Sequence, residues 1–294
     1  MLLLPSYETS SVIDLNQHAI RHNFDRAARS YDEGAVLQRK VADELLSRFQ
    51  WLRSEPATLL DVGTGTGYAI PHLRRRFRKT QVLACDIALS MARAARRHRG
   101  LWRPTPVWVA DGHDLPLRSE AVDCVYSSLA LQWMDVPRAF AEFRRVLRPD
   151  GLFTFATFGP DTLRELRAAW ADVDDRPHIH TFVDMHDLGD ALIGTGFADP
   201  VLDVECYTLT YDSARDALRD LKRIGAHNAA AGRFGGLTGK TRYRRFEEAC
   251  EVFRRDGRLP ITYEVVYGQA WVPKHVPPPF TPPPGHAVIP IRGV

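Results

Sequence analysis

The feature that most constrains this chain is a hydrophobic run that passes directly into a glycine cluster, ATLLDVGTGTG at residues 57–67. Its six leading residues are rich in Leu and Val, which predicts a short buried strand, and the residues that follow, up to Phe77, have helical character. Gly63, Gly65 and Gly67 can take positive φ and leave no Cβ between the loop and a ligand. The stretch therefore predicts a strand, a loop and a helix that together hold a flat, polar small molecule.

Two common nucleotide-binding motifs do not fit this loop. A dinucleotide fingerprint would place its third glycine at residue 68, which is Tyr68. The Lys-Ser/Thr pair that completes a phosphate-binding P-loop does not follow the glycines either. The spacing therefore differs from both motifs.

Three successive predicted strands each end in an acid. Asp61 ends the first strand, Asp86 follows the run QVLAC and lies nineteen residues after Gly67, and Asp111-Gly112 follows the run VWVA. Open parallel sheets bind ligands at the carboxyl ends of their strands, where an acid at Asp86 can accept hydrogen bonds from both ribose hydroxyls. Three such acids suit a ligand that carries a ribose, an adenine amine and a positive charge.

The glycine loop and these acids, in this order and spacing, resemble the class I S-adenosylmethionine-dependent methyltransferases. The resemblance implies an α/β, Rossmann-like fold with a seven-stranded, mostly parallel sheet, in which the glycine loop holds the methionine part, Asp86 the ribose and Asp111 the adenine amine. It implies no metal ion. The residues expected to bind S-adenosylmethionine are Asp61, Gly63, Gly65, Gly67, Asp86, Ile87, Asp111, Gly112 and Ser128.

Composition argues against a membrane or secreted protein. The chain has 294 residues, of which 45% are hydrophobic, but no stretch approaches the roughly 20 apolar residues that a membrane span needs. Residues 1–4 are apolar but lack a basic lead-in, so we expect no signal peptide. The four cysteines have no metal-ligand spacing. We therefore expect a cytoplasmic protein with no membrane partner.

Charge is unevenly distributed along the chain. Between Arg215 and Arg258 there are twelve basic and six acidic residues, whereas the net charge of the whole chain is only +3. A local excess of this size is typical of a docking face for an acidic partner. A pair of solvated helix faces is an equally good explanation.

The order of predicted elements divides the chain into three parts. Residues 1–22 are expected to be a flexible lead, 23–272 a methyltransferase domain, and 273–294 a proline-rich, disordered tail. The domain begins with a helical segment whose residues 24–31 could close over the ligand or act as a brace. A basic helical lid, about residues 212–258, is inserted before the last strand and is the expected place for substrate choice.

The residues at the end of the fourth predicted strand narrow the range of possible methyl acceptors. Methyltransferases that act on exocyclic base nitrogens have an Asn/Asp-Pro-Pro-aromatic turn here, whereas this chain has SSLA at residues 127–130. A nucleic acid substrate of that type is therefore not expected. No cysteine is obviously placed for thiol-dependent metalloid methylation, which leaves an oxygen acceptor.

The whole pattern resembles the malonyl-acyl carrier protein O-methyltransferases of biotin synthesis. The resemblance rests on F-x-R-A-A-x-x-Y-D from Phe24, S-x-L-A-L-Q-W from Ser127 and L-K-x-I-G-A-x-N from Leu221, and it runs from about Asn23 to Trp271. It departs at Ser128, where the family commonly has Asn, and in the tail. The resemblance implies methyl transfer from S-adenosylmethionine to the free carboxylate of malonyl-acyl carrier protein. It also implies an acidic carrier protein, which could dock on the basic region. Fatty-acid elongation enzymes would then extend the methyl ester toward pimeloyl, the biotin precursor.

This reaction needs no catalytic base, because a malonyl carboxyl with a pKa of about 4 is already an anion at neutral pH. Tyr31, Gln132 and Trp133 are our candidates for the substrate pocket, although each could be a packing residue. Two other function classes remain open. One is a small-molecule methyltransferase, for example on a quinone precursor, with His113, His178, His180 or His186 as the base. The other is a methyltransferase-like assembly factor that serves a protein partner.

Overall fold

The computed structural model describes residues 16–51, 55–100, 104–226 and 239–274. Most of the expected flexible lead, part of the lid and most of the proline-rich tail fall on residues 1–15, 227–238 and 275–294, which lie outside the described residues. Among the described helices, none combines the length and the apolar character that crossing a membrane requires.

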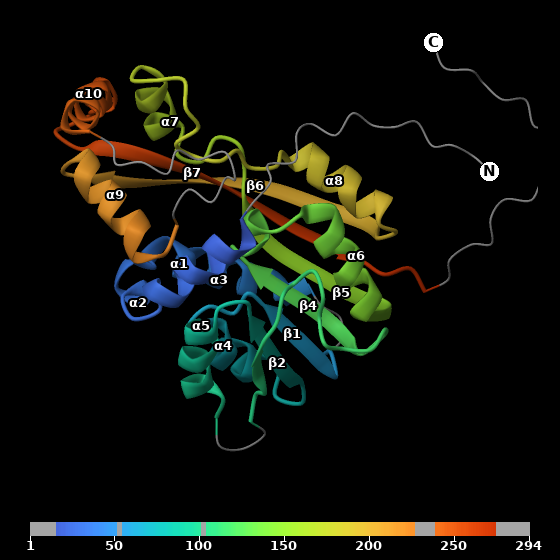
Figure 1. The fold of residues 1–294 in the computed structure, drawn as a ribbon. Coiled ribbons are helices and arrows are strands. Elements are labelled where there is room, and N and C mark those ends of the chain that lie inside the picture. Colours follow the sequence, from blue (N-terminus) through green and yellow to red (C-terminus); the bar gives the residue numbers. More distant parts are fainter. Residues whose placement is uncertain (1–15, 52–54, 101–103, 227–238, 275–294) are drawn as a thin grey trace, which may run out of the picture.

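A seven-stranded sheet forms the centre of the protein (Figure 1), with the strand order β3-β2-β1-β4-β5-β7-β6. The first five strands run parallel, and β7 is antiparallel to both β5 and β6. The predicted α/β fold with a mostly parallel sheet is therefore confirmed. The strands are β1 (Thr58–Val62), β2 (Gln81–Asp86), β3 (Val107–Val109), β4 (Val122–Ser128), β5 (Leu147–Phe158), β6 (Ala198–Tyr211) and β7 (Leu259–Trp271).

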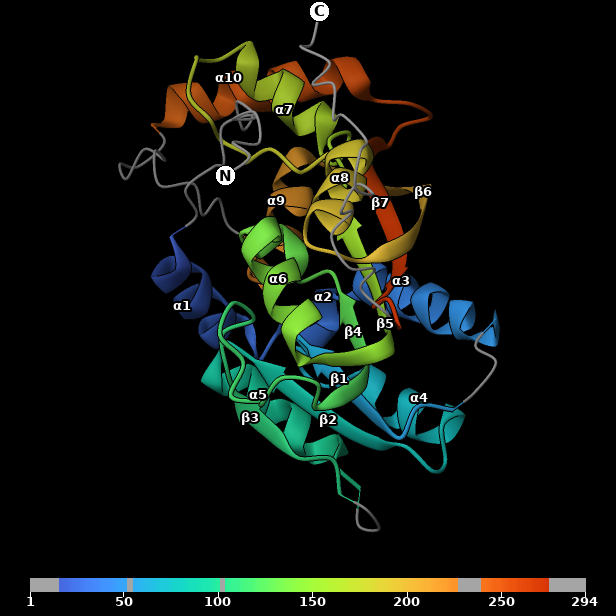
Figure 2. The same cartoon turned by 90° about the vertical axis from the view of Figure 1, so that its right-hand side faces the viewer.

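Helices cover both faces of the sheet (Figure 2), because alternate strand residues point to opposite faces. In β1, Leu59 packs with α3 and α4 on one face, whereas Leu60 packs with α6 on the other. The helices are α1 (Gln17–Ala27), α2 (Tyr31–Gly34), α3 (Val36–Ser47), α4 (Ala69–Arg76), α5 (Leu89–Ala95), α6 (Val136–Val146), α7 (Arg164–Ala171), α8 (Met185–Gly194), α9 (Ala214–Arg223) and α10 (Lys240–Cys250).

The N-terminal end of the fold differs from the sequence-based expectation. We expected a flexible lead up to residue 22, but α1 already begins at Gln17, so the expectation is wrong for residues 17–22. The side chain of Asn16 accepts a hydrogen bond from the Ala19 N–H and caps the helix. Ile20 is buried, and Asp25 accepts a hydrogen bond from the Ser90 N–H at 2.7 Å, which ties α1 to the start of α5.

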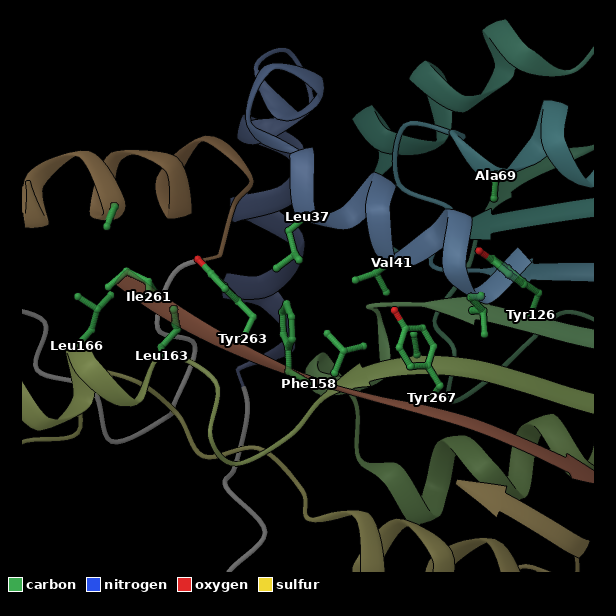
Figure 3. Packing of buried hydrophobic residues seen from close by; sticks show 14 of the residues in the cluster. Leu37, Val41, Ala69, Tyr126, Phe158, Leu163, Leu166, Ile261, Tyr263 and Tyr267 are labelled. Atoms are coloured by element: carbon green, nitrogen blue, oxygen red, sulfur yellow. The ribbon is translucent and has the colours of Figure 1, made fainter. Parts of the chain in front are cut away.

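The lid helices α9 and α10 lie between β6 and β7 in the chain, as predicted. One hydrophobic cluster continues from the sheet into this region (Figure 3), with side chains from α3, β5, α7 and β7 packed together. On α10, Phe246 stacks on Trp170 of α7 with ring centroids 4.2 Å apart. The lid therefore shares its core with the sheet.

Helix α7 begins at Arg164. The residues just before it are held by β7: the Thr162 hydroxyl donates to the Glu264 carbonyl at 2.9 Å, and Leu163 takes a left-handed φ of 60°. This anchoring turns the chain before the helix can start, so α7 crosses the end of β7.

Candidate active site

The glycine loop has the backbone that its sequence predicts. Gly63, Gly65 and Gly67 have φ values of 74°, 58° and 89°. A Cβ on Gly63 would lie 2.3 Å from the Cβ of Ala130, and one on Gly67 would lie 2.8 Å from the Cα of Ala95. A Cβ on Gly65 would meet only the Tyr31 ring, at 4.0 Å. Gly65 therefore faces open space, whereas the other two permit close packing.

A cavity of about 630 Å³, a volume that includes space open to solvent, lies over this loop. It brings together most of the residues that the sequence singled out, from the ends of β1, β2, β3 and β4 and from the N-terminal helices. Those that line it are Tyr31, Gly63, Gly65, Asp86, Ile87, Asp111, Gly112, Ser128 and Trp133. We refer to it as the cofactor cavity.

Asp86 is buried at the end of β2, with 7% of its surface exposed. Its two carboxylate oxygens accept hydrogen bonds from the N–H groups of Gly65, at 2.9 Å, and Ala88, at 2.8 Å. Burial raises the pKa of this carboxyl to about 6, and the two N–H donors oppose the rise. Each oxygen keeps a lone pair that can accept from a ligand hydroxyl.

Asp61 is more deeply buried, at 1% exposure, and accepts a hydrogen bond from the Thr64 hydroxyl at 2.6 Å. Burial raises its pKa to about 7, the Thr64 bond opposes this, and the charge of Asp86 adds to it. Asp61 lines an adjoining cavity of about 480 Å³ that shares Tyr31, Gly65 and Ser128 with the cofactor cavity. Among the described residues, no ion pair joins either Asp61 or Asp86 to a cationic side chain, so both suit a ligand with hydroxyls and a positive charge.

Asp111 and Gly112 form the far wall of the cofactor cavity. Asp111 Oδ1 lies 2.7 Å from Nδ1 of His113, and Nε2 of His113 accepts from the Asp135 N–H at 2.9 Å. His113 therefore holds Asp111 in place and is not free to act as a base. Gly112 is close to Met134, whose methyl carbon lies 2.8 Å from the position that a Cβ would take.

The N-terminal helices cover the cofactor cavity. Gln17, Ile20 and Phe24 line it from α1, and the Gln17 side-chain amide donates to the Trp133 carbonyl at 3.0 Å. On the loop side, the Thr66 hydroxyl donates to the Asp32 carboxylate at 2.7 Å. The segment after residue 23 therefore lies over the cavity, where a segment that closes over a ligand would have to be.

A second, apolar cavity of about 890 Å³ lies beneath the lid. Trp133 lines both this cavity and the cofactor cavity, so the two adjoin at its side chain. We refer to the second cavity as the lid chamber. Its walls come from β5, α7, the loop before α8, α9 and β7, and include Phe158, Leu166, Trp170, His178, His180, Phe182, Leu218, Leu221, Lys222 and Tyr263.

Two predicted site residues lie away from these cavities. The Gln132 amide donates to the Leu129 carbonyl at 2.7 Å and its oxygen lies 3.4 Å from the Thr157 hydroxyl, and Gln132 is not among the described residues that line any of the three cavities. Gly67 is also outside them and packs against Ala95. The structure therefore does not bring these two residues to the walls of the three cavities, because neighbouring atoms already occupy their contacts.

The histidines considered as bases have different surroundings. His178 pairs with Asp174 at 2.8 Å and stacks on Trp170, while His186 is exposed and pairs with Asp184 at 2.9 Å. His180 alone of the four faces the lid chamber without a described hydrogen bond to its Nε2. The described residues contain no group of three or more His, Cys, Asp or Glu side chains that could hold a metal ion.

Sequence reasoning missed Gln17, Ile20, Met91 and Met134, which all line the cofactor cavity. The spacing of Ile20, Phe24 and Ala27 after Asn16 was a usable helix signal, since it puts three apolar residues on one face behind an N-cap. The lid chamber gave no comparable signal, because its walls come from segments far apart in the sequence.

A family model described as "Methyltransferase domain" matches residues 60–155. Malonyl-[acyl-carrier protein] O-methyltransferase of Laribacter hongkongensis is 54% identical to this chain over 263 residues, which cover 86% of this chain and 89% of the relative. The enzyme of that name from Halorhodospira halophila is 50% identical, with 87% and 88% covered. The chain belongs to the malonyl-[acyl-carrier protein] O-methyltransferase family.

Solved structures show the same fold at lower sequence identity. The YcgJ protein of Bacillus subtilis is 17% identical and aligns over 80% of this chain and 99% of its own, with a TM-score of 0.55. The [4+2]-cyclase SpnF is 20% identical, with 80% and 81% covered and a TM-score of 0.50. Because a cyclase shares this fold, the assignment of this chain to the malonyl-[acyl-carrier protein] O-methyltransferase family rests on sequence identity to its relatives.

Proposed function

We propose that this protein transfers the methyl group of S-adenosylmethionine to the free carboxylate of malonyl-acyl carrier protein. The observation that carries the proposal is the shared wall of the two cavities at Trp133. A sulfonium methyl held over the glycine loop and an acyl group entering from the lid chamber would meet at this side chain. Membership in the malonyl-[acyl-carrier protein] O-methyltransferase family identifies that acyl group.

The residues of the cofactor cavity fit S-adenosylmethionine. Asp86 would accept from the ribose hydroxyls, Asp111 from the adenine amine, and Asp61, Gly63, Gly65 and Ser128 would surround the methionine part. When bound, this co-substrate supplies a methyl group activated by the positive charge on sulfur. Ile87 and Gly112 complete the walls that the adenosine would contact.

The reaction is a displacement at the methyl carbon. A carboxylate oxygen forms the new C–O bond with its own electron pair while the C–S bond breaks and its electrons return to sulfur. Since one anion and one cation become two neutral groups, water exclusion favours the transition state over the separated charges. Alignment of the two reactants can contribute roughly 7–11 kcal/mol. Apolar walls that include the half-buried side chains of Phe24 and Trp133 would provide both effects.

Tyr31 is the polar side chain best placed beside the reacting groups, because it lines both the cofactor cavity and the adjoining one. Burial, together with the charges of Asp86 and Asp32, raises the pKa of its hydroxyl above the usual range. The hydroxyl therefore stays protonated at neutral pH. It would orient a carboxylate by donating a hydrogen bond and would not act as a base.

We also propose that the acidic carrier protein docks on the basic lid. Many lid arginines are offset by a nearby acid, as Arg219 is by Asp216 at 2.6 Å and Arg244 by Glu248 at 3.6 Å. Four exposed basic residues are in none of the ion pairs found among the described residues, which leaves their charge available to a partner. They are Lys222, Lys240, Arg245 and Arg255.

The activity is tested by incubating the protein with S-adenosylmethionine and malonyl-acyl carrier protein, with acetyl-acyl carrier protein as the control, and measuring the intact mass of each carrier. We expect one added methyl on the malonyl form alone. Bound S-adenosylmethionine without methylation of the malonyl form would refute the proposal and redirect the search to small-molecule acceptors or a protein partner.

The four cysteines are all free thiols, and only Cys206 is exposed. This supports the cytoplasmic location expected from the sequence, because reducing compartments keep thiols unpaired.

A further inference from the structure

His180 is a buried polar side chain in a largely apolar wall. It lies in the loop between α7 and α8, with 6% of its surface exposed. Its ring centroid is 5.1 Å from that of Trp133 and 4.6 Å from that of Phe182. The Nε2 atom is buried and has no hydrogen-bond partner within the described part of the chain. Buried polar atoms are rarely left in this state, so the atom calls for a ligand.

The imidazole of His180 is neutral at physiological pH. Burial, together with the nearby positive charge of Arg167, lowers its pKa to about 4. Two nitrogens of the Arg167 guanidinium donate to the carbonyls of Pro160 and Thr162, at 2.8 and 3.0 Å, while its Nε is buried without a partner among the described residues. A neutral imidazole whose Nε2 carries the proton is a hydrogen-bond donor without charge. It matches a carbonyl oxygen better than a carboxylate.

The position of His180 relative to Trp133 suggests which carbonyl it meets. In a malonyl thioester the carboxylate carbon and the thioester carbonyl are separated by a single CH₂ group. If the carboxylate lies at the methyl group, on the cofactor side of Trp133, the thioester carbonyl lies next to it, toward the lid chamber. His180 contacts Trp133 from that chamber. The apolar space beyond it leads beneath α9, where Leu218 and Leu221 line the wall.

We propose that the lid chamber holds the thioester arm of the substrate and that the Nε2–H of His180 donates a hydrogen bond to the thioester carbonyl. This inference rests on the function proposed above and adds to it the position of the arm and a substrate-binding residue. His180 fixes the acyl group so that its carboxylate points at the methyl carbon. It takes no proton in the reaction.

The test compares His180→Phe, which keeps an aromatic ring but removes the donor, with His180→Gln, which keeps a donor. The substrates are malonyl-pantetheine, which has no carrier protein, and malonyl-acyl carrier protein. Loss of a buried hydrogen bond of this kind predicts a kcat/KM about 10-fold lower for His180→Phe on both substrates, with partial recovery in His180→Gln. The affinity for S-adenosylmethionine, measured by calorimetry, should stay within about two-fold of wild type.

A second pair of variants tests the chamber itself. Leu221→Trp fills the lid chamber, whereas Ile193→Trp adds the same side chain at an exposed position on α8. We expect Leu221→Trp to lose most of its turnover of malonyl-pantetheine while still binding S-adenosylmethionine, and Ile193→Trp to keep wild-type turnover. Retained S-adenosylmethionine binding shows that a variant is folded.

The outcomes separate this inference from the function on which it rests. If wild-type protein does not methylate malonyl-acyl carrier protein, both are overturned. If it does, and either His180→Phe or Leu221→Trp keeps the wild-type kcat/KM on malonyl-pantetheine, only the present inference is overturned. A parallel loss of S-adenosylmethionine affinity in His180→Phe would also overturn it, because it would place His180 in the cofactor site.

Discussion

The backbone N–H of Gly65 donates a hydrogen bond of 2.9 Å to the carboxylate of Asp86, which joins the glycine loop directly to the end of β2. The same carboxylate also accepts from the Ala88 N–H, at the start of the segment that leads into α5. One buried acid therefore fixes two loops on neighbouring strands. Asp86 would hold both loops while its remaining lone pairs accept hydrogen bonds from the ribose hydroxyls of S-adenosylmethionine.

Asp86→Asn should weaken cofactor binding strongly. The amide keeps the size of the side chain but has a single acceptor oxygen, so one of the N–H groups of Gly65 and Ala88 loses its acceptor. The ribose loses a charged acceptor as well. A hydrogen bond to a charged group contributes about 1.5–3 kcal/mol, which predicts an S-adenosylmethionine Kd roughly 10- to 100-fold higher by titration calorimetry. Asp187→Asn, on α8, is the matched control. An unchanged Kd in Asp86→Asn would remove Asp86 from the cofactor site.

Cofactor affinity should rise with pH between 5 and 8. In the ligand-free protein the pKa values of Asp61 and Asp86 are raised to about 7 and about 6, whereas an unfolded chain has the ordinary value of 3.8. Folding therefore retains protons that the unfolded chain releases between pH 4 and 7. These two groups favour the folded state fully below pH 4 and lose that contribution as pH rises through their folded pKa values.

Binding a cation and its hydroxyls favours the ionised carboxylates, so S-adenosylmethionine should bind at least about 10-fold more tightly at pH 8 than at pH 5. Calorimetry in two buffers with different ionisation enthalpies should show proton release at pH 6. Asp61→Asn should release fewer protons. A Kd that does not change over this pH range would contradict the raised pKa values.

Two glycines of the loop, Gly63 and Gly65, should respond differently to alanine. Gly63→Ala places a Cβ 2.3 Å from that of Ala130 at a positive φ, which combines overpacking with backbone strain. We expect a loss of roughly 2–4 kcal/mol in the free energy of unfolding, measured with urea. Gly65→Ala should lower the free energy of unfolding by only about 1–2 kcal/mol, from backbone strain alone, since its Cβ meets nothing closer than the Tyr31 ring.

For cofactor affinity we expect the opposite order. Gly65→Ala should weaken the binding of S-adenosylmethionine more than Gly63→Ala does. Both glycines line the cofactor cavity, but a Cβ on Gly63 would point at Ala130, whereas one on Gly65 would face open space. The new methyl group of Gly65→Ala would therefore project toward the ligand and raise the Kd of S-adenosylmethionine well beyond its small effect on stability. Equal losses of stability in Gly63→Ala and Gly65→Ala would show that the loop relaxes around both side chains.

The contrast between Asp86 and His180 shows how much of the site the sequence could predict. Asp61, Asp86 and Asp111 each directly follow a hydrophobic run, and parallel strands bring such ends to one edge, so a local pattern was sufficient to place all three together. Trp133 was found by resemblance to the family. Gln132, its neighbour, points elsewhere, because adjacent residues in a short helical turn face different directions.

The lid chamber could not be predicted in this way. His180 lies in the loop that follows α7, and α7 is anchored on β7 through Glu165, whose carboxylate accepts from the Thr262 N–H at 2.9 Å and lies 2.6 Å from its hydroxyl. Glu165 and Thr262 are 97 positions apart in the sequence, and nothing in the local pattern around either residue indicates the other as its partner. Helix α1 is a different kind of failure, because the spacing of Ile20, Phe24 and Ala27 was a usable signal that was overlooked among mostly polar residues.

Charge reversal on α10 should weaken the use of the carrier protein without changing the chemistry. Arg245→Glu removes a positive charge that no ion pair offsets among the described residues, whereas the charge of Arg244 is already partly compensated by Glu248. In the double variant Arg244→Glu/Arg245→Glu, we expect the KM for malonyl-acyl carrier protein to rise roughly 10-fold or more. Arg245→Glu should cause most of this effect. The KM for malonyl-pantetheine should not change, because that substrate has no carrier to dock.

The control is a double reversal at Arg75 and Arg97, which are exposed and belong to α4 and the turn after α5, outside the lid. It changes the net charge by the same amount, so any loss it shares with the α10 variant reflects long-range attraction and not docking. The wild-type KM for the carrier should also rise with salt, and the α10 variant should be less sensitive to it. If the α10 and control variants behave alike on the carrier, the acidic protein docks elsewhere, and the charges of the lid are a solvated surface.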